Sequence, residues 1–347
     1  MRRTSYPKTA KLADVARLAR VSTATVSRTL SLPHKVKAAT AARINQAVET
    51  LGYVAHGAAR ALASRRTRTI GAVLPTLDNT IFAKTVQALQ RTLDQAGYML
   101  LVASDEHDAE AETRVARALI EHGVDGLVLL GTTHHECVLK MLDTHQVPYV
   151  LTWALDPEDR HPCVGFDNRA AGVRIARHLL DLGHREFAMI SGLTAGNERA
   201  RGRLRGVREE LAAHGIAIAP HRLVEKPYAF AAGREGLREV LGGAKWPTAV
   251  ICGNDLLAIG ALAECHECRI AVPRELSITG FDDMEIADVV TPGLTTIHFP
   301  ASELGALAAQ HLLARLTGQE VAPRTELPVE LVVRGSTAPP LLEGRDL

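Results

Sequence analysis

Four residues near the N-terminus have the side-chain types and the spacing needed to read base edges in a DNA groove. Thr23, Ala24, Ser27 and Arg28 recur at helical spacing, so a helix here would carry them on one face. Small residues would let the helix enter the major groove deeply, and an arginine can donate two hydrogen bonds to guanine O6 and N7. The stretch therefore predicts sequence-specific DNA binding.

The elements that must position these residues are also visible in the sequence. An apolar face at i, i+3, i+4 and i+7 predicts a first helix and comprises Leu12, Val15, Ala16 and Ala19. Ser22 is a good N-cap for a second helix over 23–30, with Val26 and Leu30 facing inward. A third helix is expected over 38–51. Together these elements form a helix-turn-helix pattern.

The charge distribution favours the same interpretation. Residues 1–68 contain 14 Lys and Arg and two acidic residues, a net charge of +12, whereas residues 69–347 have a net charge of −11. Such asymmetry is typical of a nucleic-acid-binding module joined to an acidic body. Two alternatives for the basic segment are a disordered tail and a helical hairpin without DNA contacts. Apolar periodicity argues against the first, and the +12 charge against the second.

From residue 69 onward, short apolar runs alternate with amphipathic stretches, which predicts parallel sheets covered by helices on both faces. The expected strands are 69–75, 98–103, 125–130, 148–153, 163–167, 186–191, 248–253, 276–282, 295–300 and 328–334. The expected helices are 82–96, 109–122, 168–182, 200–214, 254–267 and 301–316. So many strands exceed one compact lobe, and we expect two doubly wound α/β lobes.

No enzyme or metal motif stands out. The chain lacks G-x-G-x-x-G after a strand, G-x-x-x-x-G-K-[ST], G-x-S-x-G and H-E-x-x-H. Cys265 and Cys268 flank His266 within a predicted helix and have no partner pair, and His134 and His135 are expected at the surface of a loop. We therefore expect no catalytic residue, no metal ligand and no cofactor.

The sequence also shows no pattern typical of a membrane-spanning or secretory segment. No apolar run approaches the roughly 20 residues that cross a bilayer, and no secretory signal follows the first arginines. Five cysteines in 347 residues do not suggest a disulfide framework. A cytoplasmic protein without a membrane partner is expected, which disfavours a free-standing sugar-binding transport protein.

Longer motifs carry a resemblance over essentially the whole chain. LADVARLARVSTATVSRTLS and the following VKAATAARINQAVETLGYVAHGAARALAS resemble the N-terminal domain of lactose-repressor (LacI) family transcription regulators. DGLVLL, VGFDN, ICGNDLLAIGAL and LSITGFDDMEIADVVTPGLTTI match the family in the same order. The resemblance implies a repressor with an N-terminal all-α helix-turn-helix head and a two-lobed body like periplasmic binding proteins.

The resemblance also implies domain boundaries. The expected parts are a DNA-binding domain at 1–55, a hinge helix and linker at 56–68, a ligand-binding and dimerisation domain at 69–340, and a tail at 341–347. Within the body, the N-lobe is expected to comprise about 69–167 and 300–326, and the C-lobe about 168–298 and 327–340.

For the head, the resemblance assigns residue roles. Thr23 and Ala24 would choose the operator, and Arg28 is the fixed arginine. Further DNA contacts are implied for Ser22, Thr25, Ser27, Lys37 and Thr40, and for Leu62 as a minor-groove wedge in the hinge helix. The sequence departs from the family pattern at two places. Arg20 stands where many members carry glycine in the turn, and Ala55-His56 stands where Pro-Asn is often found before the hinge helix.

For the body, ligands of open α/β sheets bind beyond the carboxyl ends of strands, so we expect a site in the cleft between the lobes. In the family, Arg203 supplies a planar donor fork, Asp282 accepts from hydroxyls, and Asn254 does both. The full set of candidate ligand residues is Asn79, Phe82, Thr132, Asp167, Arg203, Tyr228, Asn254 and Asp282. From spacing alone, Arg203 in its arginine-rich helix would be solvated and Asp282 would be a loop cap.

The partners that follow are a palindromic double-stranded DNA operator, a small-molecule effector and a second copy of the chain in a homodimer. Motifs such as LPTLDNTIFAKTVQAL resemble gluconate-type repressors most, which points to a sugar acid as the effector. A neutral sugar or polyol, and a purine co-repressor, remain alternatives. Induction and co-repression would use the same residues, so the sign of the response stays open.

Overall fold

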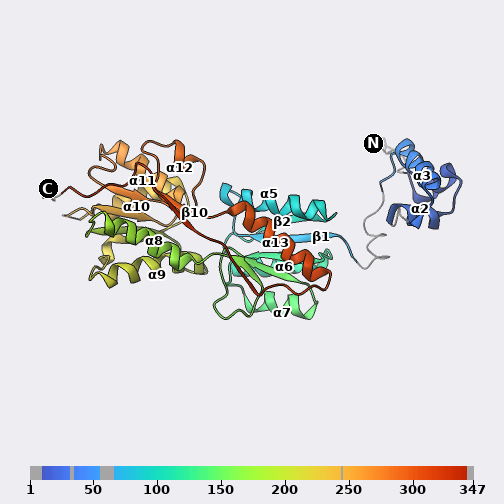
Figure 1. Ribbon diagram of the computed structural model, residues 1–347, viewed down its shortest axis with the longest axis horizontal. Coiled ribbons are helices and arrows are strands. Elements are labelled where there is room, and N and C mark those ends of the chain that lie inside the picture. The colour runs from blue at the N-terminus through green and yellow to red at the C-terminus, as the bar shows by residue number, and fades with distance from the viewer. Residues whose placement is uncertain (1–9, 32–34, 55–65, 244, 342–347) are drawn as a thin grey trace, which may run out of the picture. The chain divides into compact units, whose positions relative to one another are not determined.

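The computed structural model describes residues 10–31, 35–54, 66–243 and 245–341. The chain divides into two compact units, one ending at Arg68 and the other beginning at Thr69, which we call the head and the body. Figure 1 labels their helices and strands.

The head consists of α1 (Leu12–Ala19), α2 (Thr23–Ser31) and α3 (Ala38–Leu51). Its small core contains Val15, Ala16, Ala19, Val26, Ile44 and Ala47. Arg20 ends α1 in the left-handed conformation, with φ 54° and ψ 50°. Because this conformation costs a non-glycine residue about 1 kcal/mol or more, the strain expected from an arginine at this position is present.

One half of the body, the N-lobe, is built on a parallel sheet with strand order β11-β5-β4-β3-β1-β2. Its strands are β1 (Thr69–Leu74), β2 (Met99–Ser104), β3 (Gly126–Leu130), β4 (Tyr149–Thr152), β5 (Cys163–Gly165) and β11 (Arg324–Glu326). One face is covered by α5 (Thr80–Gln95) and α13 (Ala301–Leu316), the other by α6 (Ala109–Glu121) and α7 (Glu136–Thr144) (Figure 1).

The other half, the C-lobe, has a parallel sheet of order β7-β6-β8-β9. Its strands are β6 (Phe187–Gly192), β7 (Leu223–Lys226), β8 (Ala249–Cys252) and β9 (Ser277–Thr279). One face is covered by α8 (Asn168–Asp181) and α9 (Glu198–Ala213), the other by α10 (Phe230–Val240) and α11 (Asp255–Glu267). A 3-10 turn (Pro220–Arg222), α12 (Ile286–Val289) and the antiparallel pair β10 (Thr296–His298) and β12 (Glu330–Val332) complete this lobe.

The chain passes between the two sheets three times: from β5 to α8, from β10 to α13, and from β11 to β12. The loops after β1, β3 and β4 leave the carboxyl ends of the N-lobe sheet, and the loops after β8 and β9 leave those of the C-lobe sheet. These loops carry four of the eight candidate ligand residues, namely Asn79, Thr132, Asn254 and Asp282.

Some elements were not predicted by the apolar pattern. The strands β7 and β11 are half-exposed or exposed edge strands, which need no continuous apolar run. The helices α7, α10 and α12 were also missed, and the β10–β12 pair is antiparallel where a parallel strand was expected. Within the described part of the chain, no helix is both long enough and apolar enough to cross a membrane.

Candidate DNA interface and ligand site

The α2 helix has one face in the core of the head and one face in solvent. Val26 is fully buried and Thr29 nearly so, whereas Thr23, Ala24, Ser27 and Arg28 are all exposed. The structure therefore brings the four side chains selected from the sequence onto one accessible face.

The start of α2 is fixed by two hydroxyl groups. The Thr25 N–H donates to Ser22 Oγ (3.2 Å), as the capping prediction required, and the two side-chain oxygens lie 2.8 Å apart. Lys37 is exposed immediately before α3, and Thr40 is half-buried in its first turn. Leu62 and the Ala55-His56 pair lie outside the described residues.

In the body, Arg203 is held firmly at the junction of the lobes. Its side chain is only 6% exposed. Nε donates to Asn168 Oδ1 (2.9 Å), Nη1 donates to the Gly253 carbonyl (2.8 Å), and the guanidinium lies 3.5 Å from the centre of the Phe281 ring. The solvated position that spacing alone suggested is wrong: α9 turns Arg203 inward, as it also does Arg199, and Arg203 Nη2 faces Asp282.

Asp282 faces the same arginine. Arg203 Nη2 lies 3.7 Å from Asp282 Oδ1, which is buried and accepts no hydrogen bond among the described residues. Burial raises the pKa of this carboxyl to about 7, against the lowering effect of Arg203 and Arg199. The backbone of Asp282 has φ 111°, a strained value for a non-glycine residue.

Asn254 caps α11 and carries a second unpaired group. Its side-chain oxygen accepts from the Leu257 N–H (3.0 Å), while Nδ2 is buried without a partner among the described residues. Asn79 and Asp167 are likewise N-caps, of α5 and α8. The capping hydrogen bonds alone explain the positions of the Asn79 and Asp167 side chains, so the ligand contacts of these two residues stay predictions.

Aromatic rings fill the space beside these polar groups. Phe82 packs edge-on against Trp153, with ring centres 4.8 Å apart, and Trp153 packs in the same way against Phe299. Trp153 is 2% exposed, and its Nε1 has no hydrogen-bond partner among the described residues. Trp153 was not among the residues predicted from the sequence. It lies directly after β4, however, and candidate ligand residues were sought just beyond the carboxyl ends of strands.

Tyr228 lies close against the carboxyl end of β6. A Cβ added to Gly192 would lie 2.2 Å from the phenol atoms of Tyr228, so only glycine leaves room for this ring. Burial raises the pKa of the Tyr228 phenol. The ring is thereby fixed beside Arg203 and Asp282, whose charges act on it.

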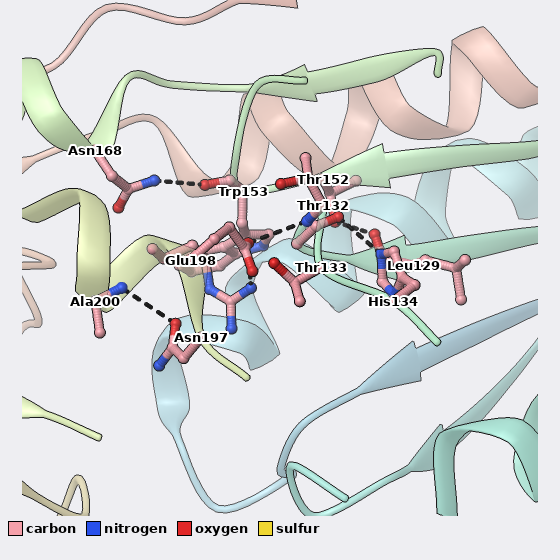
Figure 2. Close-up of polar contacts among 12 residues, drawn as sticks. Leu129, Thr132, Thr133, His134, Thr152, Trp153, Asn168, Asn197, Glu198 and Ala200 are labelled. Atoms are coloured by element: carbon pink, nitrogen blue, oxygen red, sulfur yellow. Dashed lines mark hydrogen bonds and ion pairs between the residues drawn. The ribbon is translucent and has the colours of Figure 1, made fainter. Parts of the chain in front are cut away.

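The loop after β3 connects the two lobes through polar contacts (Figure 2). The Thr132 N–H donates to Glu198 Oε1 (3.0 Å), and Arg201 Nη2 donates to Thr133 Oγ1 (3.2 Å). Near the first crossover, Asn168 Nδ2 donates to the Trp153 carbonyl (2.9 Å). These contacts hold α8 and α9 of the C-lobe against the N-lobe.

His134, in the same loop, was expected at the surface. Its side chain is 2% exposed and its Nδ1 lies 2.5 Å from Glu112 Oε1, so the predicted surface position is wrong, whereas His135 is exposed. Burial lowers the pKa of His134, but the hydrogen bond and charge of Glu112, together with the Gly131 carbonyl and the charge of Glu198, leave the pKa raised. The pair supports the loop that Thr132 belongs to.

The cysteine motif shows no metal-site geometry. Burial raises the pKa of the Cys265 thiol to about 12, and Cys268 is exposed. Among the residues described, no three His, Cys, Asp or Glu side chains are grouped as metal ligands.

Comparisons with known proteins agree with this architecture. Residues 11–56 match the model for bacterial regulatory proteins of the lacI family, and residues 176–337 match a periplasmic binding protein-like domain. The ribose operon repressor of Escherichia coli (strain K12) is 34% identical over 331 residues, which cover 94% of this chain and 99% of that protein.

Two solved structures are also similar. The transcription regulator GntR from Chromobacterium violaceum is 34% identical with a TM-score of 0.74, covering 78% of this chain and 99% of that one. The lac repressor dimer bound to operator and the anti-inducer ONPF is 28% identical with a TM-score of 0.85, covering 95% and 100%.

Proposed function

The chain belongs to the lacI family of bacterial regulatory proteins, and we propose that it acts as a homodimer on a palindromic operator under the control of a sugar acid. Membership makes it a DNA-binding transcriptional repressor with an effector-binding domain, and not an enzyme. The operator geometry, the effector and the residues that contact them are the parts we propose.

In the proposed DNA complex, α2 lies in the major groove. Thr23 and Ala24 choose the bases, and Arg28 donates to a guanine. Ser22, Thr25 and Ser27 contact phosphates or the groove, while Lys37 and Thr40 lie near the backbone. Leu62 enters the minor groove between the two half-sites. The exposure of the four α2 side chains supports this assignment.

The effector site is the buried group of polar side chains where the lobes meet. The observation that carries the proposal is a set of buried atoms that have no hydrogen-bond partner among the described residues: the acceptor Asp282 Oδ1 and the donors Asn254 Nδ2 and Trp153 Nε1. Because a buried polar atom without a partner costs about 1–3 kcal/mol, these atoms suit a ligand with several hydroxyl groups.

The position of Arg203 favours a sugar acid over a neutral sugar as the effector. Its Nε and Nη1 are occupied by Asn168 and Gly253, while Nη2 lies 3.7 Å from Asp282 Oδ1, beyond hydrogen-bond distance, and can donate to a ligand carboxylate that comes closer. The likeness to GntR adds weight to a gluconate-type ligand. The second candidate is a neutral sugar, which the likeness to the ribose operon repressor favours and which Asp282 would also bind.

A thermal-shift screen of the full chain with gluconate, ribose and hypoxanthine tests the proposal. Gluconate at 100 times its Kd should stabilise the body by about 2.7 kcal/mol, and Asp282→Asn should reduce this shift strongly. Glu303→Gln, on the exposed side of α13, is the matched control. A shift with ribose alone would replace the sugar acid by a neutral sugar, and a shift unaffected by Asp282→Asn would refute the site.

For the dimer, the N-lobe offers an edge strand with apolar side chains in solvent. Met99 and Val102 on β2 are 65% and 37% exposed, and Leu77 in the loop after β1 is 62% exposed. The lac repressor, to which the chain is similar over 95% of its length, is described as a dimer. Sedimentation at micromolar concentration should give a dimer, and a stable monomer would contradict the proposal.

A further inference from the structure

Asp255, the first residue of α11, has a buried carboxyl group that the proposed effector site does not use. It is fully buried, directly after Asn254 in the chain, and the loop that carries Asp282 packs against it. Capping does not explain its position, because the helix is capped by the Asn254 side chain, which accepts from the Leu257 N–H. Both carboxyl oxygens of Asp255 are directed instead at other segments of the C-lobe.

Three hydrogen bonds join Asp255 to both ends of the loop after β9 and to the strand β10. The Asp255 N–H donates to the Phe281 carbonyl (2.8 Å), and Oδ2 accepts from the Met284 N–H (2.7 Å). The Thr296 hydroxyl on β10 donates to Oδ1 (2.6 Å). Asp282 lies between the two points at which the loop is attached. One residue of α11 therefore holds the loop on both sides of a proposed effector ligand.

The backbone of this loop is strained and needs support from its surroundings. Asp282 has φ 111° and Asp283 has φ 49°, so two successive residues other than glycine have positive φ. Such values persist only where neighbouring contacts hold the backbone in place. Gly280 makes room for the contact with Asp255, because a Cβ at this position would lie 2.2 Å from Asp255 Oδ1.

The side chain of Asp283 has contacts of its own on the outer side of the loop. Oδ1 accepts from Arg334 Nη2 (2.8 Å), and Oδ2 lies 2.9 Å from His298 Nδ1. Arg334 and His298 are partly exposed, whereas Asp255 and Thr296 are fully buried. Because solvent screens exposed ion pairs, the buried bonds to Asp255 are the firmer attachment of the loop.

We propose that Asp255 is a positioning residue of the effector site, which fixes Asp282 relative to Asn254 through its bonds to both ends of the loop. This role rests on the proposed effector site, in which Asp282 and Asn254 bind hydroxyl groups of the ligand. Groups that are oriented before binding give the full affinity, so loosening the loop lowers affinity although no ligand contact is deleted.

The charge state of Asp255 suggests a conservative substitution. Burial, and next the charge of Asp282, raise the pKa of the Asp255 carboxyl well above its ordinary value. The neutral amide of asparagine is therefore a close substitute. It can accept from the Met284 N–H through its oxygen and donate to the Thr296 hydroxyl through its nitrogen.

Calorimetric titration of the full chain with gluconate tests the proposal. Asp255→Ala removes both side-chain bonds and should weaken gluconate binding at least about 50-fold. Asp255→Asn keeps both bonds, so its affinity should stay within about threefold of wild type. Thr296→Val removes one of the two bonds and should give an intermediate loss, of about three- to tenfold.

Glu264→Ala is the matched control for a general loss of stability. Glu264 is a largely buried carboxylate on the same helix, but it accepts from Arg234 and Arg238 on α10. Both alanine variants should unfold at lower urea concentration than wild type, and only Asp255→Ala should bind gluconate less tightly. The positioning role would be overturned by wild-type gluconate affinity in Asp255→Ala, by equal losses in Asp255→Ala and Asp255→Asn, or by an equal loss in Glu264→Ala.

Hydrogen exchange separates the role of Asp255 from the identity of the effector. In the ligand-free protein, the Met284 amide should exchange at least about tenfold faster in Asp255→Ala than in wild type or Asp255→Asn, because its acceptor is missing. Absence of gluconate binding by wild type would refute the sugar acid, and the same variants would then be titrated with ribose. An unchanged exchange rate of Met284 in Asp255→Ala would overturn the positioning role whichever sugar binds.

Discussion

The head and the body use arginine in opposite ways. Arg28 is exposed on α2, and no contact of its side chain is found among the described residues, whereas Arg203 is 6% exposed and fixed by Asn168, Gly253 and the Phe281 ring. The head segment has a net charge of +12 and the rest of the chain −11. The exposed Arg28 can find a hydrogen-bond partner on the bound molecule. The buried Arg203 is already oriented by its contacts within the protein before any ligand binds.

The exposed and the buried arginine suit different kinds of ligand. A flexible, solvated cation suits a long, uniformly charged polymer, because much of the binding free energy comes from released counterions. A desolvated and hydrogen-bonded cation suits a small ligand, because its orientation is set before binding.

The largest expected effect is the response to salt. Operator binding by the full chain should fall by roughly 10³-fold or more between 50 and 200 mM salt if six or more phosphates are contacted. Effector binding should change only about threefold over the same range, because the site is buried and little screened. Titrations of both ligands at four salt concentrations check this, and equal salt slopes would break the comparison.

The next effect concerns the buried arginine. Arg203→Lys should weaken effector binding by about 100-fold, because lysine cannot keep the bonds to Asn168 and Gly253 and present a donor to the ligand as well. Urea unfolding should also show a loss of about 1–3 kcal/mol. Arg208→Lys on the exposed side of α9 should change neither quantity. Wild-type effector affinity in Arg203→Lys would remove this residue from the site.

The exposed arginine should have a smaller and more selective effect. Arg28→Ala should weaken operator binding by about 10- to 100-fold, as expected for the loss of one bidentate base contact. Binding to a scrambled duplex of the same length should fall far less. An equal loss on both duplexes would show that Arg28 contacts phosphate rather than a base.

The smallest effect is the pH dependence of stability. The pKa of Asp282 is about 7 in the folded protein, against 3.8 for an ordinary aspartate. The folded state therefore holds this proton more tightly, so the stability contributed by protonated Asp282 is full below pH 4 and is lost as the pH rises through 7.

The free energy of unfolding of the body should thus fall by about 2–3 kcal/mol more between pH 5 and pH 7.5 in wild type than in Asp282→Asn. Both tryptophans, Trp153 and Trp246, lie in the body, so their fluorescence during urea unfolding reports on this unit alone. Identical pH profiles of the two proteins would show that Asp282 does not titrate in this range.

The head could be predicted almost completely from the sequence, because its core contacts are local. Val15, Ala16 and Val26 follow helical spacing, and the cap at Ser22 is a sequence signal. In the body, buried strands were visible as apolar runs, but the exposed edge strands β7 and β11 were not.

The ligand site was less predictable, since burial decides it and burial is tertiary. Among the arginines of α9, spacing does not reveal that Arg203 alone carries the hydrogen bonds to Asn168 and Gly253. Arg199 was missed for the same reason, because its position against Gly131 of the other lobe is a tertiary contact, whereas Trp153, directly after β4, could have been found from the strand-end rule.

The central proposal is that binding of the effector in the body changes the affinity of the protein for its operator. The direct test measures operator affinity of the full chain, at one salt concentration, with and without a saturating amount of the sugar or sugar acid that gives the largest thermal shift. We predict at least a fivefold change, and effector affinity must then change by the same factor when operator is present. Leu62→Ala should lower operator affinity about tenfold or more while effector affinity of the DNA-free protein stays constant. Operator affinity that is identical with and without bound effector would contradict the account.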